Sequence, residues 1–126
     1  MALRSTLGRV RGLGSAKEGV AHWWAQRTTA VALVPLSLWF VATLIAHLGG
    51  DYGHAVQWIG APVPAILMVL LIGTTFYHAV LGLQVVVEDY VHEEWAKLTM
   101  LVLLRLACFV LAVSGIFAVL RLAFRG

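Results

Sequence analysis

The sequence predicts an all-α integral membrane protein with three transmembrane helices. Of its 126 residues, 61% are hydrophobic and only 12% are charged, whereas a soluble domain of this size carries about a quarter charged residues. Three long apolar segments follow one another, with short polar stretches between them. Because a spanning helix needs about 20 mostly apolar residues, three spans fill the chain, and it forms one membrane domain.

The composition also excludes several other classes of protein. A soluble enzyme, a disordered tail and a nucleic-acid-binding module are not expected, although the formal net charge is +3. The single cysteine, Cys108, rules out a disulfide within the chain and a zinc knuckle. The segments are too apolar for membrane barrel strands, in which polar and apolar residues alternate.

The predicted helices cover residues 28–48, 62–87 and 98–120, and they follow an N-terminal segment, residues 1–27. The stretches between the helices are expected to be short polar loops. The second helix opens with two prolines, at a position where a missing N–H costs little. Pro35 lies inside the first helix and is expected to kink it, because proline cannot donate to the carbonyl four residues earlier.

The positions of lysine and arginine predict the orientation. Six of them lie in the N-terminal segment and the second loop, two in the C-terminal tail and none in the first loop. The positive-inside rule then places the N-terminus in the cytoplasm and the C-terminus on the opposite, periplasmic side. The N-terminal segment lacks the apolar core of a signal peptide. It fits an interfacial helix with Leu3, Leu7, Val10 and Leu13 on one side, and a mitochondrial transit peptide is the alternative.

His78 lies near the middle of the second predicted helix. Ionisable groups at that depth are costly and mark functional sites by default. We expect either a ligand of a metal or haem, a proton relay, or a neutral histidine that is hydrogen-bonded to a neighbouring helix. Asp89 follows on the same helix face, about 16 Å further along the axis. Gly82 lies between them and leaves room for a flat cofactor edge or a closely packed helix.

Glu88, Asp89 and Tyr90 lie where the second helix leaves the membrane. A carboxylate and a phenol at that depth can bind and protonate a lipid-soluble carbonyl compound, because the phenol donates a hydrogen bond and the carboxylate relays protons. A solvated helix end with an interfacial tyrosine is the alternative interpretation.

Two arginines have more than one interpretation. Arg27 is expected at about the level of Asp89, where it pairs with that carboxylate, binds an anionic group, or serves as a positive-inside anchor beside the tryptophans. Arg105, seven residues into the third helix, either snorkels to the interface or binds a lipid phosphate or a partner's carboxylate.

The remaining histidines lie at lesser depth, before the first span, at span ends or in loops. If His78 ligates a haem together with a second histidine, that histidine therefore comes from another chain.

Taken together, these residues resemble a known family. Residues 22–28 read His-Trp-Trp-Ala-Gln-Arg-Thr, residues 78–84 read His-Ala-Val-Leu-Gly-Leu-Gln, and residues 88–91 read Glu-Asp-Tyr-Val. The pattern resembles the hydrophobic membrane anchor subunit (the D subunit) of bacterial succinate dehydrogenase, the succinate:quinone oxidoreductase called complex II. The most specific element of this pattern is a histidine that is followed four residues later by a glycine. After six further residues comes an aspartate–tyrosine pair.

The resemblance implies roles for individual residues. His78 is expected to be the anchor's axial ligand to the iron of haem b, with the other ligand supplied by the cytochrome b subunit. Tyr90 is expected to hydrogen-bond a ubiquinone carbonyl, and Asp89 to take part in proton delivery. Arg27, and more loosely His22, correspond to residues near the haem propionates.

The resemblance also implies partners and a location. The chain would dock the flavoprotein and iron–sulfur subunits to the membrane. Together with the cytochrome b subunit these chains would form a heterotetramer, and the heterotetramers can associate further as trimers. It would oxidise no succinate itself. The bacterial inner membrane is expected, rather than the mitochondrial one. The alternatives are a fumarate reductase anchor and a cofactor-free structural membrane protein such as a holin or an assembly factor.

Overall fold

The computed structural model describes residues 13–125 and is helical over most of that range. Three long helices, α2 (Leu13–Ala46), α4 (Pro62–Tyr90) and α5 (Glu94–Phe124), are joined through a short helix, α3 (Tyr52–Gly60). Each long helix is long and apolar enough to cross a membrane, and the described residues contain no strand. The predicted all-helical protein with three membrane-spanning helices is therefore confirmed.

Each spanning helix is longer than predicted. α2 begins at Leu13, so part of the N-terminal segment continues the same helix, and the other three residues of the predicted interfacial helix lie outside the described residues. α4 ends at Tyr90 and α5 begins at Glu94, which leaves only residues 91–93 between them. The difference arises because an existing helix extends at little cost into polar residues at the membrane boundary.

The first connection is not the irregular polar loop that the sequence suggested, because it contains α3. Gly49 ends the preceding helical segment with φ at +90°, a conformation that glycine adopts without steric cost. Asp51 then caps α3, since its side chain accepts a hydrogen bond from the backbone N–H of His54 at 2.9 Å. The prediction of a loop is therefore wrong for residues 52–60.

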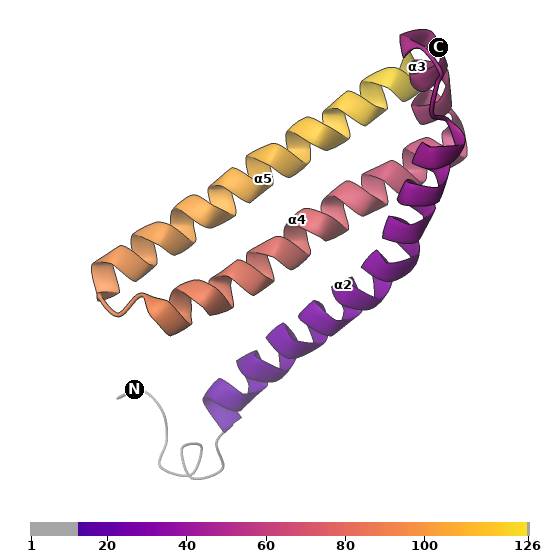
Figure 1. Ribbon diagram of the computed structural model, residues 1–126. Coiled ribbons are helices and arrows are strands. Elements are labelled where there is room, and N and C mark those ends of the chain that lie inside the picture. Colours follow the sequence, from indigo (N-terminus) through magenta and orange to yellow (C-terminus); the bar gives the residue numbers. More distant parts are fainter. Residues whose placement is uncertain (1–12, 126) are drawn as a thin grey trace.

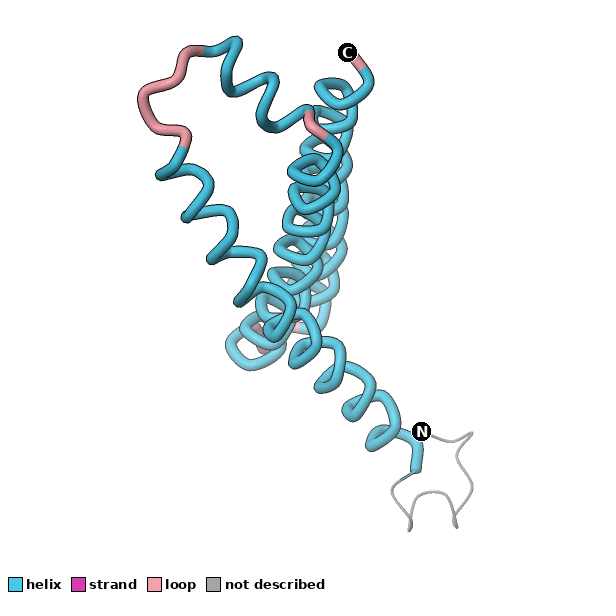
Figure 2. Tube along the Cα trace, turned by 90° about the vertical axis from the view of Figure 1, so that its right-hand side faces the viewer, coloured by secondary structure: helices cyan, strands magenta, loops and turns pink. Residues whose placement is uncertain are grey.

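The prolines lie where the sequence placed them. Two of them occupy the first turn of α4, and Pro35 lies inside α2, which stays helical through it. Figure 1 shows that α2 bends in its second half. A bend is expected there because Pro35 has no N–H to donate and its ring crowds the preceding turn. Beyond the bend α2 diverges from the other long helices, and α3 leads the chain back to them (Figure 2).

α4 is the central helix. It contacts α2, α3 and α5, whereas α2 and α5 do not contact each other within the described part of the chain. The start of α2 and the α4–α5 connection lie at one end of the bundle, and α3 and the C-terminal end of α5 lie at the other (Figure 1). α4 and α5 approach closely at Gly115, where an added Cβ would lie 3.3 Å from Cγ2 of Ile72.

The helices bury few side chains against one another. The buried apolar residues of the described range are Ala65, Leu81, Val87, Cys108 and Val119. Many large apolar side chains remain exposed on all three long helices. Surface of this kind must be covered by lipid or by other chains.

The approach of α3 to α5 depends on Gly60. A Cβ at this position would lie 2.8 Å from the carbonyl oxygen of Leu122, which is backbone and cannot move aside cheaply. Gly60→Ala is therefore expected to destabilise the chain by about 1–3 kcal/mol through overpacking. The unfolding midpoint in a denaturing-detergent titration, followed by tryptophan fluorescence, measures this.

Gly73→Ala is the matched control, because a Cβ at that position of α4 meets nothing within 4 Å. It is expected to be neutral or to stabilise by up to about 1 kcal/mol through helix propensity. Equal midpoints for the two variants would contradict the proposed contact between α3 and α5.

Candidate functional site

His78 lies on α4 where α2 crosses it. Its Nδ1 atom is 2.8 Å from Oγ1 of Thr29 on α2, and the ring is half-buried. Thr29 is only 8% exposed and is the one buried polar residue of the described range. Its Oγ1 is also 2.9 Å from the carbonyl oxygen of Ala25 and 3.0 Å from that of Gln26. A histidine at mid-membrane depth is therefore held by a side chain from a neighbouring helix.

The other ring nitrogen of His78, Nε2, is unpaired within the described part of the chain. Its Nε2 has no hydrogen-bond partner among the described residues and is not one of the fully enclosed side-chain nitrogens. Nε2 can therefore bond to a group outside the chain. No cluster of three or more histidine, cysteine, aspartate or glutamate side chains suited to a metal occurs among the described residues. Three such side chains of the described residues therefore do not meet at His78.

Gly82, one turn from His78, faces the same helix. A Cβ on Gly82 would lie 3.9 Å from Nε2 of Gln26 on α2. Of the two interpretations given above, the structure supports the closely packed helix at this glycine. The crossing is therefore built from Thr29 and Gln26 on one side and from His78 and Gly82 on the other.

The two candidate residues at the start of the first span lie on different sides of α2. His22 precedes Thr29 by seven residues, which is almost two full turns, so it shares the face toward α4. Its Nε2 is buried and has no hydrogen-bond partner among residues 13–125. Arg27 is exposed, and its guanidinium carbon lies 5.3 Å from the ring centroid of Trp23, a distance typical of a cation–π contact.

Arg27 does not lie at the level of Asp89 along the helices, as the sequence had predicted. Arg27 lies two residues before Thr29, which is level with His78, while Asp89 lies eleven residues beyond His78 on the antiparallel α4. At 1.5 Å per residue, Arg27 and Asp89 are therefore about 13 Å apart along the helix axes. The difference arises because α2 starts at Leu13, which places Arg27 well inside the helix rather than at its end.

The residues at the end of α4 face outward. Asp89 and Tyr90 are both exposed, Tyr90 by 77%, and α4 ends at Tyr90. The last turn is closed by a hydrogen bond from the N–H of Val91 to the carbonyl of Val87. The phenol and the carboxylate are thus carried on a regular helix end and are accessible to a molecule that approaches from the membrane or from another chain.

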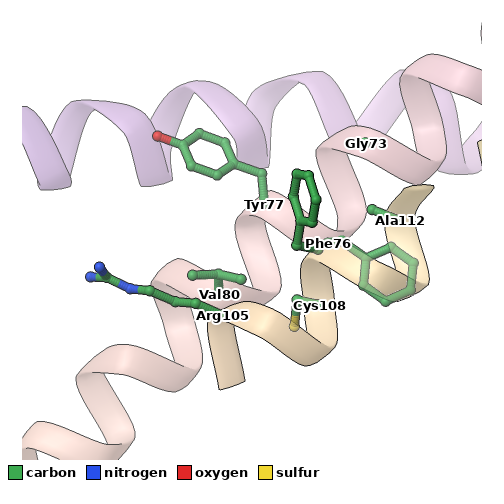
Figure 3. A pocket seen from close by; sticks show the side chains of 8 residues that line it. Gly73, Phe76, Tyr77, Val80, Arg105, Cys108 and Ala112 are labelled. Carbon is green, nitrogen blue, oxygen red and sulfur yellow. The ribbon is translucent and has the colours of Figure 1, made fainter. Parts of the chain in front are cut away.

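Arg105 has a partner that the sequence did not indicate. Its Nη2 donates to Oε1 of Gln84 on α4 at 3.1 Å, and Nε2 of Gln84 donates to Oε2 of Glu88 at 3.4 Å. The arginine also borders a groove of about 290 Å³ between α4 and α5, which Figure 3 shows. The groove is lined by Gly73, Phe76, Tyr77, Val80, Arg105, Cys108, Phe109 and Ala112.

Two of the histidines near the first connection, His47 and His54, contact each other. Nδ1 of His47 is 2.7 Å from Nε2 of His54, and the ring of His47 stacks on Trp58 with centroids 4.5 Å apart. These contacts tie the end of α2 to α3 at the end of the bundle opposite the exit of α4. The pair therefore lies far from His78.

Thr29, Gln26 and Gln84 are residues of the site that sequence reasoning missed. The seven-residue interval between His22 and Thr29 marks one helix face and could have indicated Thr29. Nothing in the sequence shows which threonine meets which histidine, because the register between two helices depends on their packing.

The comparisons that match known proteins all indicate the same family. Residues 1–112 match the family model described as the succinate dehydrogenase/fumarate reductase transmembrane subunit. The succinate dehydrogenase hydrophobic membrane anchor subunit of Rickettsia bellii is 34% identical over 116 residues, which is 92% of this chain and 93% of that protein. The protein of the same name from Rickettsia conorii is 29% identical over 87% of this chain and 88% of its own length.

A bacterium of another genus has a similar protein. The succinate dehydrogenase hydrophobic membrane anchor subunit of Paracoccus denitrificans is 33% identical over 79 residues, which is 63% of this chain and 61% of that protein. No solved structure matches significantly. The family model covers most of the chain, and the chain therefore belongs to the succinate dehydrogenase/fumarate reductase transmembrane subunits, among the hydrophobic membrane anchors of succinate dehydrogenase.

Proposed function

We propose that this anchor subunit supplies one axial ligand of a haem b through His78 and one wall of the ubiquinone-reduction site through Tyr90 and Asp89. The observation that carries the proposal is the geometry of His78. Its Nδ1 is held by Thr29 at 2.8 Å, while its Nε2 has no partner in the described part of the chain. A histidine held in this way presents one free nitrogen in a fixed direction.

The residues present fit a haem shared between two chains. A ligating histidine commonly engages its other ring nitrogen in a hydrogen bond, as His78 does with Thr29. No second histidine of the described range lies at this depth, so a cytochrome b subunit would supply the opposite ligand. A bound haem would provide one-electron redox chemistry. His22, whose Nε2 is buried without a partner, and Arg27 are the candidates to meet its propionates.

The exit of α4 fits the quinone site. Ubiquinone dissolves in the bilayer, so its site must open to lipid, and the exposed Tyr90 lies at the end of a membrane-spanning helix. The phenol would donate a hydrogen bond to a quinone carbonyl. The carboxylate of Asp89 would pass protons from the aqueous phase to the reduced quinone.

The exposed apolar surface supports the proposed assembly. The chain leaves many large apolar side chains exposed on all three long helices, and partner subunits would cover part of that surface. We propose a heterotetramer with cytochrome b, iron–sulfur and flavoprotein subunits in the bacterial inner membrane, with the N-terminus in the cytoplasm. The family model covers both succinate dehydrogenases and fumarate reductases, so a fumarate reductase anchor is the second candidate.

His78→Leu tests the haem ligand. The variant complex, purified in mild detergent, is expected to lose the b-type signal in a reduced-minus-oxidised optical spectrum, because leucine has no lone pair to bind iron. His92→Leu is the matched control, since His92 is exposed in the α4–α5 connection. A complex that keeps all of its haem in the His78→Leu variant would refute the assignment.

Tyr90→Phe tests the quinone site. Loss of the phenol is expected to lower quinone reduction by about 10²-fold, the lower end of the range for a positioned acid–base group, while the haem spectrum stays unchanged. Tyr52→Phe is the matched control, because Tyr52 is 78% exposed, close to the 77% of Tyr90, but lies at the opposite end of the bundle. Unchanged quinone reductase activity in Tyr90→Phe would remove Tyr90 from the site.

A further inference from the structure

We propose that Thr29 is the positioning residue of the axial ligand. Its hydroxyl accepts the Nδ1 proton of His78 and so holds the imidazole in the tautomer whose Nε2 carries a free lone pair. The inference rests on the proposed role of His78 as a haem ligand. It goes further, because it names the group within this chain that sets the tautomer of His78 and strengthens its donation through Nε2.

Two arrangements of protons fit the 2.8 Å contact. In the first, the Thr29 hydroxyl donates to Nδ1 of His78, and the ring proton is then on Nε2, which has no acceptor among the described residues. In the second, Nδ1–H donates to Oγ1, and the hydroxyl donates onward to the carbonyl of Ala25 at 2.9 Å or of Gln26 at 3.0 Å.

The second arrangement makes two hydrogen bonds where the first makes one. In a membrane span no water can replace the missing bond, and an unpaired polar group is expensive there. The geometry therefore favours the tautomer of His78 that carries its proton on Nδ1 and leaves the lone pair of Nε2 free. That form of neutral imidazole is the one that binds a metal.

The position of Thr29 makes this hydrogen bond rigid. The side chain is β-branched, which restricts its rotation within a helix, and it is only 8% exposed. Its hydroxyl is held by the backbone carbonyls of its own helix. The imidazole of His78 therefore cannot rotate about its axis without losing its partner, and the direction of Nε2 is fixed by α2.

A hydrogen bond to Nδ1–H also makes the imidazole a stronger donor. Partners of this kind raise the basicity of the ligand, and their loss costs about 10–100-fold in metal affinity. A stronger donor stabilises the more highly charged, oxidised iron. Removal of the Thr29 hydroxyl is therefore expected to weaken haem binding and to shift the haem midpoint potential to more positive values.

The test compares purified complexes that carry Thr29→Val and Thr29→Ser. Valine keeps the shape of threonine but has no hydroxyl, and serine keeps the hydroxyl. Thr29→Val is expected to release haem to apomyoglobin about 10–100-fold more readily and to show a more positive midpoint potential in an optical redox titration. Thr29→Ser is expected to match the wild-type complex in both measurements.

Thr43→Val is the matched control. Thr43 lies in the same helix, and its hydroxyl donates to the carbonyl of Trp39, so valine removes the same kind of intrahelical bond without touching a histidine. Its midpoint potential is expected to equal that of the wild type. Equal shifts in Thr29→Val and Thr43→Val would assign the effect to helix structure and overturn the inference.

The remaining outcomes separate the inference from the proposed function. Haem loss in His78→Leu together with a wild-type potential in Thr29→Val overturns the role of Thr29 alone, whereas full haem retention in His78→Leu overturns both. If the valine variant does not assemble, Thr29→Cys takes its place, because a thiol is of similar size and a weak acceptor. It is expected to shift the potential in the same direction, and a wild-type potential there overturns the inference.

Discussion

The hydrogen bond between Thr29 and His78 is the interaction on which the arrangement of the site depends. A hydroxyl and an imidazole inside a bilayer have no water to bond, so each must find its partner in protein. The contact fixes how far α2 is shifted along α4, and Gln26 then lies beside Gly82. The same register places His22 on the face toward α4 and separates Arg27 from the end of α4.

The sequence predicted the spans well because bilayer thickness and backbone hydrogen bonding leave few alternatives to long apolar helices. The sequence-based prediction was wrong where local helix capping or helix packing determines the structure. The helix α3 follows from one aspartate and a glycine at positive φ, which are weak signals within a polar stretch. Arg27 was placed at the end of its helix, because the hydropathy pattern marks the end of the apolar segment and not the end of the helix.

Side-chain partners were harder to predict than helices. His78, Asp89 and Tyr90 stand out in the sequence because polar groups are rare inside or beside an apolar span. Thr29 does not stand out, since threonine in a helix usually bonds its own backbone, and only the crossing of α2 over α4 gives it a second partner. Arg105 was ambiguous for the same reason, because its acceptor is a glutamine on another helix.

The bonds of Arg105 also bear on how the end of α4 is held. Arg105 donates to the oxygen of the Gln84 amide, and the nitrogen of that amide donates to Glu88. The amide dipole thus has its negative end toward the cation and its positive end toward the carboxylate, so each bond strengthens the other. One N–H of an arginine within the third span is thereby paired with α4, and α5 is connected to the turn that precedes Asp89 and Tyr90. The end of α4 is therefore supported from α5, while His78 near its centre is held from α2.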